Sequence, residues 1–138
     1  MSIERVTPEG ERELRLVAQK LEADLRFVGL EVAQAGDCFS GSADLLDGFV
    51  VFYDPSASDD ESQGVFVRWR PSTELLAAAR ESGDMDSMPV VVGGVAMDAI
   101  MESLQKILLA LGWEVETERV GVHESSLKVC RRKEWVPE

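Results

Sequence analysis

The amino-acid sequence predicts a single α+β domain that spans residues 1–138. Its predominantly antiparallel sheet, of about five to six strands, is expected to pack against a long N-terminal helix, a long helix in the C-terminal half and one short helix. Three observations predict this class. The length suits one hydrophobic core. Two long segments repeat apolar residues at helical spacing, and short apolar runs typical of strands lie between and after them.

The first predicted helix follows Thr7, a suitable N-cap, and has Pro8 at its first position, where a missing N–H is no loss. Gly29 is a fitting residue just beyond its C-terminus. The apolar stripe of this helix consists of Leu14, Val17, Leu21, Leu25 and Val28. Residues 1–6 and 134–138, at the two ends of the domain, are expected to fray.

The segment after this helix is predicted to form strands. The first covers residues 30–35 and ends at Gly36 and Asp37. Residues 43–46 and 49–53 flank the dipeptide Asp47-Gly48, which favours a two-residue hairpin turn. Because residues 49–53 are apolar on both faces, we expect them at the centre of the sheet.

A polar loop at residues 54–64 separates these strands from the next one. Residues 65–70 alternate in polarity and are expected to form a half-buried strand that ends at the following proline. A short helix then covers residues 74–81, with Ser72 or Thr73 as its cap.

Residues 82–94 are predicted to be a loop, in which Val90 to Val92 form either a short strand or an extended lead-in to the next helix. The two glycines that follow invite a comparison with phosphate-binding loops. No lysine accompanies them, however, and Asp98 stands where an anion would be favoured. A simple turn is the expected role of Gly93 and Gly94.

The last predicted helix has the clearest stripe in the chain and ends at Gly112. Its apolar residues are Met97, Ile100, Met101, Leu104, Ile107, Leu108 and Leu111. An antiparallel hairpin is expected after it. On the outer face of this hairpin Glu118 pairs with Lys128. In the same register Glu114 pairs with Arg132, so that opposite charges lie across the ladder.

The charge of the chain is strongly negative: 26 acidic and 14 basic residues give a net charge of −12. Between Phe27 and Val67 the sequence has acidic residues and no lysine or arginine; we call this stretch the acidic belt. Such a surface repels nucleic acid and anionic membranes and attracts basic partners. We therefore expect no nucleic-acid and no membrane binding. No apolar run approaches the ~20 residues of a membrane span, and no signal peptide is evident, so a cytoplasmic location is expected.

Candidate catalytic and metal-binding residues are few. The sequence has 1 histidine, His123, which is expected in an exposed loop. Cys38 and Cys130 have neither the spacing of a metal site nor the surroundings of a nucleophile. We therefore expect no catalytic residue, no metal and no cofactor.

Three groups of residues are candidates for binding. The acidic candidates, from the belt, are Asp54, Asp59, Asp60 and Glu61. Met85 and Met88 are flexible apolar side chains in a polar segment, which suits an adaptable partner-binding surface. Arg68 and Arg70 lie on one face of a strand and suit a carboxylate or phosphate. Neutralisation of the neighbouring acids is the simpler explanation for these two arginines.

The order of elements, together with the acidity, resembles that of the small acidic α/β chaperones that bind secreted proteins as dimers. The resemblance covers topology and charge, and it implies a homodimer. We expect a non-enzymatic acidic interaction protein, chaperone-like or inhibitor- and immunity-like, that binds a basic or partly apolar protein surface. The alternative is a small ligand-binding domain or enzyme with an anion pocket around Arg68 and Arg70.

Overall fold

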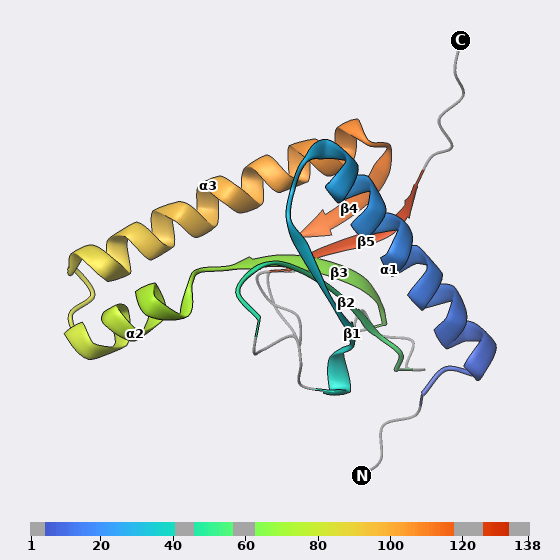
Figure 1. Cartoon of the computed structure of the whole chain (residues 1–138), viewed down its shortest axis with the longest axis horizontal. Helices are drawn as coiled ribbons and strands as arrows, with labels where there is room; N and C mark the ends of the chain where they lie inside the picture. The colour runs from blue at the N-terminus through green and yellow to red at the C-terminus, as the bar shows by residue number, and fades with distance from the viewer. Residues whose placement is uncertain (1–4, 41–45, 57–62, 118–125, 133–138) are drawn as a thin grey trace.

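The computed structural model describes residues 5–40, 46–56, 63–117 and 126–132 (Figure 1). These residues form a five-stranded, mostly antiparallel sheet with two long helices and one short helix, which confirms the predicted fold class. The elements in chain order are α1 (Pro8–Val28), β1 (Val32–Asp37), the 3₁₀ turn η1 (Cys38–Ser40), β2 (Gly48–Asp54), β3 (Gly64–Arg70), α2 (Thr73–Ser82), α3 (Met88–Ala110), β4 (Trp113–Thr117) and β5 (Leu127–Arg132).

The strands of the sheet follow the order β1-β2-β3-β5-β4. The pair β1 and β2 is parallel, and the other neighbours are antiparallel. β5 comes last in the chain but lies inside the sheet, between β3 and β4. The edge strands are therefore β1 and β4.

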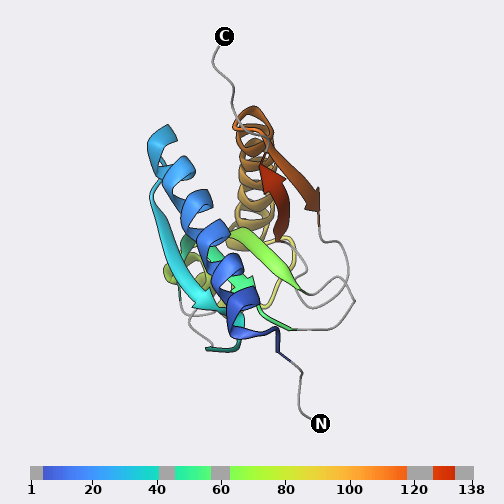
Figure 2. The same cartoon turned by 90° about the vertical axis from the view of Figure 1, so that its right-hand side faces the viewer.

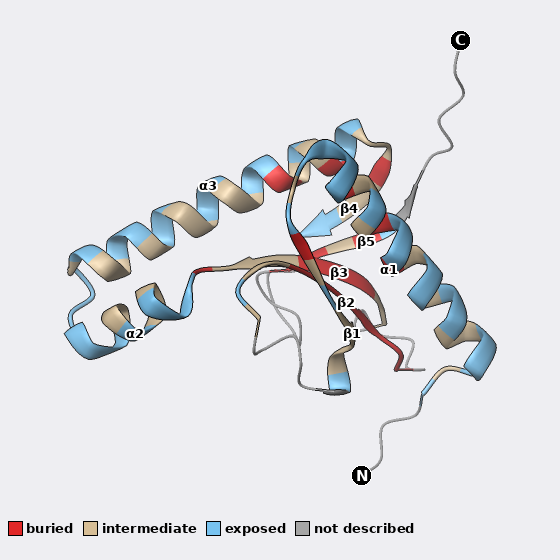
Figure 3. Cartoon of the chain, in the orientation of Figure 1, coloured by how far each residue is buried: buried red, intermediate tan, exposed pale blue. Residues whose placement is uncertain are grey.

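The main core lies between one face of the sheet and the two long helices. In Figure 2, α1 lies beside β1 and α3 lies beside β4, in agreement with their contacts. The buried side chains of this core are Ala18, Leu21, Leu25, Val32, Val51, Tyr53, Val65, Val67, Leu104, Leu108, Trp113, Leu127 and Val129. Figure 3 shows buried positions along the sheet and in the C-terminal half of α3, and Ala18, Leu21 and Leu25 are the buried positions of α1.

A smaller cluster occupies the opposite face of the sheet. Its buried members are Val50, Phe52 and Phe66, and the rings of the two phenylalanines stack with their centroids 5.4 Å apart. Ala35, Cys38 and Leu46 pack against it.

α1 begins and ends as its sequence predicts. The Thr7 hydroxyl accepts a hydrogen bond from the Gly10 N–H at 3.1 Å, and Pro8 occupies the first turn. Gly29 closes the helix in the left-handed conformation, with φ 111°. Near its C-terminus Asp24 accepts a hydrogen bond from the indole Nε1–H of Trp113 at 3.0 Å, which ties α1 to β4.

The predicted hairpin at Asp47-Gly48 is wrong. Gly48 is the first residue of β2, which pairs with β1 on one side and with β3 on the other. Because β1 and β3 pair with the two edges of β2, β2 has no free edge for the predicted hairpin partner. Residues 43–45 of that predicted strand lie outside the described residues.

The predicted loop at residues 82–94 is wrong from Met88 onward, because α3 begins there. Ser87 adopts the N-cap conformation, Pro89 lies in the first turn, and the Val91 N–H donates to the Ser87 carbonyl at 3.0 Å. Gly93 and Gly94 therefore lie inside a helix. This position rules out the phosphate-binding loop that was compared with them.

The predicted register of the final hairpin is also wrong, by two residues at Lys128 and by one residue at Glu114, which lies opposite Arg131 and not Arg132. Lys128 lies opposite Glu116 and not Glu118, and a bulge interrupts β4 and β5 near Glu114. The observed register places Val115 across from Val129, so that two core side chains face each other. The loop expected around His123 lies outside the described residues.

The first two described residues, Arg5 and Val6, make backbone contacts with the end of β2 and the residues after it. Arg5 forms an isolated antiparallel bridge with Ser56. The Val6 N–H donates to the Pro55 carbonyl at 2.7 Å. These backbone contacts join the lead-in to α1 to the end of β2.

Candidate protein-interaction surface

A two-helix projection is the most distinctive part of the surface. We define the helical arm as α2, the connection 83–87 and residues 88–99 of α3. Figure 1 shows both helices of the arm extending away from the end of β3, past the sheet. Pro71 is buried where the arm leaves the sheet.

The two helices of the arm are held together by local hydrogen bonds at its tip. At the base of the arm, next to the sheet, the Ser72 hydroxyl caps α2 by accepting from the Leu75 N–H at 3.1 Å. Between the helices, the hydroxyls of Ser82 and Ser87 lie 2.8 Å apart, and the Ser87 N–H donates to the Asp84 carbonyl at 3.1 Å. These bonds turn the chain sharply and lay the start of α3 back along α2.

The arm has no buried core of its own. α2 contains no buried residue, and the buried residues of α3 are Leu104 and Leu108, both beyond the arm. The two helices of the arm approach each other closely at Gly93, where an added Cβ would lie 3.8 Å from a methyl carbon of Leu75. Half-buried side chains therefore face between the helices, and the outer face of α3 is left to the solvent.

An apolar stripe runs along that outer face. Its residues recur at i, i+3, i+4, i+7 and i+11, the spacing of one helix face. The outer stripe consists of Met88, Val91, Val92, Val95 and Ala99, all of which are exposed. Met88 and Val95 are 69% and 64% exposed, and Met85, at the tip, is 80% exposed.

Acidic residues lie near the two ends of the outer stripe. No charged residue lies in the sequence between Asp86 and Asp98. These two acids are exposed, as is Asp84 beside the tip. The result is an uncharged apolar strip with carboxylates at both ends.

Met85 and Met88, which were predicted to contact a partner, both lie at this surface. The sequence reasoning missed Val91, Val92 and Val95, because valines before a glycine pair resemble a strand or a loop. The available signal was Ser87 followed by Pro89 at the start of a helical stripe.

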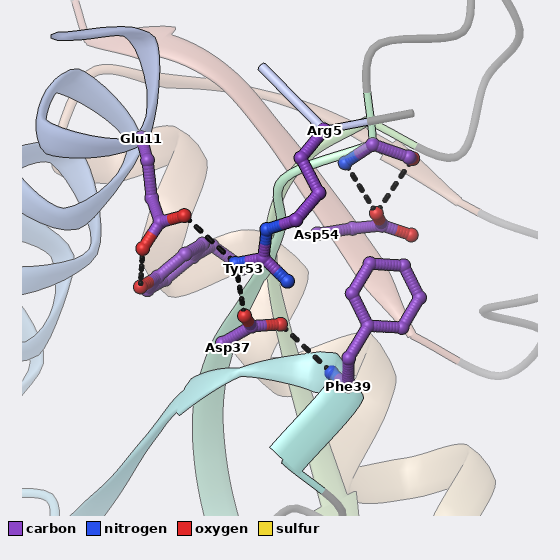
Figure 4. A network of polar contacts seen from close by, with 7 residues as sticks. Arg5, Glu11, Asp37, Phe39, Tyr53 and Asp54 are labelled. Carbon is purple, nitrogen blue, oxygen red and sulfur yellow. Dashed lines mark hydrogen bonds and ion pairs between the residues drawn. The ribbon is translucent and has the colours of Figure 1, made fainter. Parts of the chain in front are cut away.

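The acidic candidates are placed differently. Asp54 is buried, with 2% exposure, and its carboxylate accepts hydrogen bonds from the backbone N–H and hydroxyl of Ser56 (Figure 4). Asp54 is therefore unable to meet a partner at the surface. The other three, Asp59, Asp60 and Glu61, lie outside the described residues.

A polar network at the start of α1 uses two further acids. Figure 4 shows the Arg5 guanidinium between the carboxylates of Glu11 and Asp37, both of which it binds. Tyr53 donates its hydroxyl hydrogen to Glu11 at 3.2 Å. The hydrogen bond from Arg5 is the main reason that the pKa of Glu11 is lowered. This network joins α1, β1 and β2 and serves the fold.

Arg68 and Arg70 lie on the face of the sheet opposite the two long helices. In the register of β2 and β3 they pair with Val50 and Gly48. The Arg68 guanidinium lies over the Phe52 ring, 5.9 Å from its centroid. On the same face Lys128 lies 6.0 Å from the centroid of Phe66, so a third cation, not singled out from the sequence, joins the two arginines.

The described residues offer little for nucleophilic or metal chemistry. The pKa of the Cys38 thiol is raised to about 12, chiefly by burial and in part by the nearby carboxylate of Asp54. The pKa of Cys130 is raised as well, again chiefly by burial. No group of three or more metal-binding side chains occurs in the part of the chain that the structure describes.

Two further findings bear on the surface. None of the helices among the described residues has the length and apolar character needed to cross a membrane. No protein-family model, curated protein or solved structure matches the chain.

Proposed function

We propose that the chain is a non-enzymatic acidic interaction protein that binds a partly apolar protein surface through the outer stripe of its helical arm. The observation that carries the proposal is the exposure of the stripe: apolar side chains recur along one helix face and no other described element covers them. Removing apolar surface from water contributes about 25 cal/mol for each Å². A contiguous apolar surface of this kind marks an interaction site.

The carboxylates at the two ends of the stripe favour a partner whose apolar contact has a basic rim. Asp84, Asp86 and Asp98 are exposed there, and complementary charges speed encounter and select the partner. Apolar contact then supplies affinity, and charge supplies orientation. The acidic belt, including Asp59, Asp60 and Glu61, adds to the same long-range attraction.

The proposal is tested by capture of partner proteins on the immobilised full-length chain, with identification of what binds. A Val91→Ser/Val95→Ser variant should lose most of the capture seen with the wild type. Leu16→Ser is the matched control, because Leu16 is an exposed apolar residue of α1, 53% exposed, far in the sequence from the arm. Equal capture by the wild type and the stripe variant would contradict the proposal.

Salt separates the two contributions. Raising the ionic strength should weaken capture by screening the carboxylates, and an Asp86→Asn/Asp98→Asn variant should show less of this salt dependence than the wild type. Capture that strengthens with salt in both proteins would leave the apolar stripe as the sole contact and contradict the basic rim.

An anion-binding domain is the competing function. It is favoured by the presence of Arg68, Arg70 and Lys128 on one face of the sheet. This function predicts that small carboxylates or inorganic phosphate raise the melting temperature of the wild type and not that of an Arg68→Ala/Arg70→Ala variant. Equal shifts of the melting temperature in both proteins would contradict an anion-binding function at these residues.

A further inference from the structure

The two edge strands of the sheet differ in how far they are open to a further strand. An edge strand has backbone N–H and C=O groups that point away from the sheet, and these groups can pair with another extended chain. β1 and β4 are the edges among the described strands. Of these two edges, β1 is blocked and β4 is open.

Two features block the edge at β1. Its register advances from Gln34 to Gly36 while β2 advances by one residue, so the extra residue of the bulge lies on β1 itself. A bulge on an edge strand twists it and hinders the addition of another strand. The Arg26 guanidinium of α1 also donates to the Val32 carbonyl at 2.9 Å. The helix beside β1 thus already occupies a backbone group of this strand.

β4 remains regular, because the bulge beside it lies on its partner. Glu114 and Val115 are consecutive, whereas the residues of β5 that they face are Arg131 and Val129. β4 therefore keeps its alternation of faces over Trp113–Thr117. Figure 2 shows β4 at the border of the sheet, with no described strand or helix beyond it.

The two faces of β4 differ in chemistry. Trp113 and Val115 belong to the main core, on the side of the helices. Glu114 and Glu116 alternate with them and point to the opposite face, where Glu116 is exposed. A strand added beside β4 would therefore have apolar neighbours on the helix side and carboxylates on the other.

β5, which already pairs with β4, has the composition that these two faces require. It places Val129 opposite Val115 and Lys128 opposite Glu116. Apolar pairs and opposite-charge pairs across a ladder both stabilise a sheet. The side chains of β4 stand between its two edges, so a strand at the open edge would meet the same side chains. The open edge therefore favours the same alternation of apolar and basic residues.

A second copy of this chain is a poor occupant of the same edge. Two β4 strands paired antiparallel around Val115 would place Glu114 opposite Glu116 twice, and like charges across a ladder destabilise it. The net charge of −12 adds to this repulsion and attracts a basic chain instead. The glutamates thus make the open edge selective for the charge of the added strand.

We propose that the open edge of β4 is a strand-addition site, which binds an extended segment of a partner protein with alternating apolar and basic residues. In such a site backbone hydrogen bonds provide affinity, and alternate side chains provide specificity. The site uses no residue of the outer stripe, so the inference does not rest on the proposed function.

The first test is the binding of a labelled peptide to the full-length protein, followed by fluorescence anisotropy. The basic probe, Thr-Lys-Val-Arg-Val-Lys-Thr with blocked ends, should bind, whereas Thr-Glu-Val-Glu-Val-Glu-Thr should not. Two further versions of the basic probe carry N-methyl groups on the backbone nitrogens of the valines or of the basic residues. One of these two sets of N–H groups faces β4 in the added strand, so only one version should lose binding. Equal binding of all three basic peptides, or no binding of the first, would overturn the proposal.

Amide hydrogen exchange measured by NMR locates the peptide on the protein. Alternate residues of a strand direct their N–H groups to opposite edges, so the amides of Val115 and Glu116 point to different sides of β4. The basic peptide should slow exchange at the outward amides of β4 and leave exchange in β1 unchanged. Protection confined to the arm or to other parts of the surface would overturn the proposal.

Reversal of one charge tests the specificity of the edge. Glu116→Lys should weaken binding of the basic peptide by about fivefold or more, and Glu116→Gln should have an intermediate affinity. Glu74→Lys is the matched control, because it changes the net charge by the same amount at an exposed position of α2. Thermal unfolding shows that each variant is folded. Equal weakening by Glu116→Lys and Glu74→Lys would overturn the proposal.

A variant of the arm separates this inference from the proposed function. Val91→Ser/Val95→Ser should bind the basic peptide as tightly as the wild type. A loss of binding would place the peptide on the arm and contradict strand addition at β4. A protein that does not bind the peptide, but still captures partners through the outer stripe, would refute the strand-addition site and leave the proposed function intact.

Discussion

The two halves of α3 have opposite environments although they belong to one helix. In the C-terminal half Leu104 and Leu108 are buried against the sheet, within the main core. In the N-terminal half Val91 and Val95 repeat at the same spacing and remain exposed. Apolar periodicity thus identifies a face that needs a partner but does not identify the partner. For one half the partner is the sheet, whereas no described element of the chain covers the other half.

The largest expected effect is the loss of stability when a leucine in the buried half of α3 is shortened. Leu104→Ala should lower the free energy of unfolding by about 2–5 kcal/mol, because it removes buried methyl groups and leaves a cavity. Val95→Ala should change it by no more than about 0.5 kcal/mol. Urea denaturation measures the free energy of unfolding of both variants, and a low protein concentration removes any contribution from self-association. Equal losses would mean that the arm belongs to the core.

Polar side chains of the core and of the arm should also differ in their contribution to stability. Asp24→Ala leaves the buried indole N–H of Trp113 without the partner it has at 3.0 Å, and should cost about 1–2 kcal/mol. Asp98→Ala, on the exposed face of the arm, should be nearly neutral. Thermal unfolding followed by tryptophan fluorescence measures both, and Asp24→Asn, which keeps an acceptor oxygen, should recover part of the loss. A neutral Asp24→Ala would show that α1 does not depend on its bond to β4.

The N-caps of α1 and α2 should differ in the same way. Thr7 caps α1, a helix of the core, so Thr7→Ala should lower global stability by about 1 kcal/mol. Ser72 caps α2, which has no buried residue, so Ser72→Ala should speed hydrogen exchange in the arm and leave the urea midpoint almost unchanged. Hydrogen exchange read by mass spectrometry separates the two responses. A loss of global stability in Ser72→Ala would show that the arm unfolds together with the sheet.

The smallest expected effect concerns pH. The hydrogen bond from Arg5 lowers the pKa of Glu11, so this pair adds stability that is present above the unfolded-state pKa of about 4.3 and is lost as the pH falls through the lower folded value. Arg5→Met should therefore lose less stability than the wild type between pH 6 and pH 3. The urea midpoint at several pH values measures this, with Arg12→Met as control, because Arg12 is an exposed residue of α1, the helix that carries Glu11. Identical pH profiles would contradict it.

The sequence predicted the elements whose signals are local. The N-cap, proline and terminal glycine of α1 act within a few residues of one another, and each was found in its expected role. β2 was also placed correctly inside the sheet, because a strand that is apolar on both faces needs cover on both.

One error arose where distant segments decide the pairing, and another where composition outweighed a local helix start. Asp47-Gly48 favours a hairpin, but the pairing of β2 with β1 and β3 leaves no free edge for one. Val90 to Val92 have the composition of a strand, yet the helix that begins at Met88 carries them. For the candidate surface, the methionines were found from composition alone. The valines were missed because their exposure depends on how far the arm projects beyond the sheet.

The interior position of β5 has a consequence for how the chain matures during synthesis. Among the described strands β5 is translated last, yet it must enter the sheet between β3 and β4, which are translated earlier. Until Leu127 and the residues after it leave the ribosome, β3 presents a bare edge and Val65 and Val67 lack a neighbour that the finished domain supplies. We expect the sheet of the nascent chain to stay incomplete until β5 inserts. During that time the negative charge of the chain should limit its association with other nascent chains.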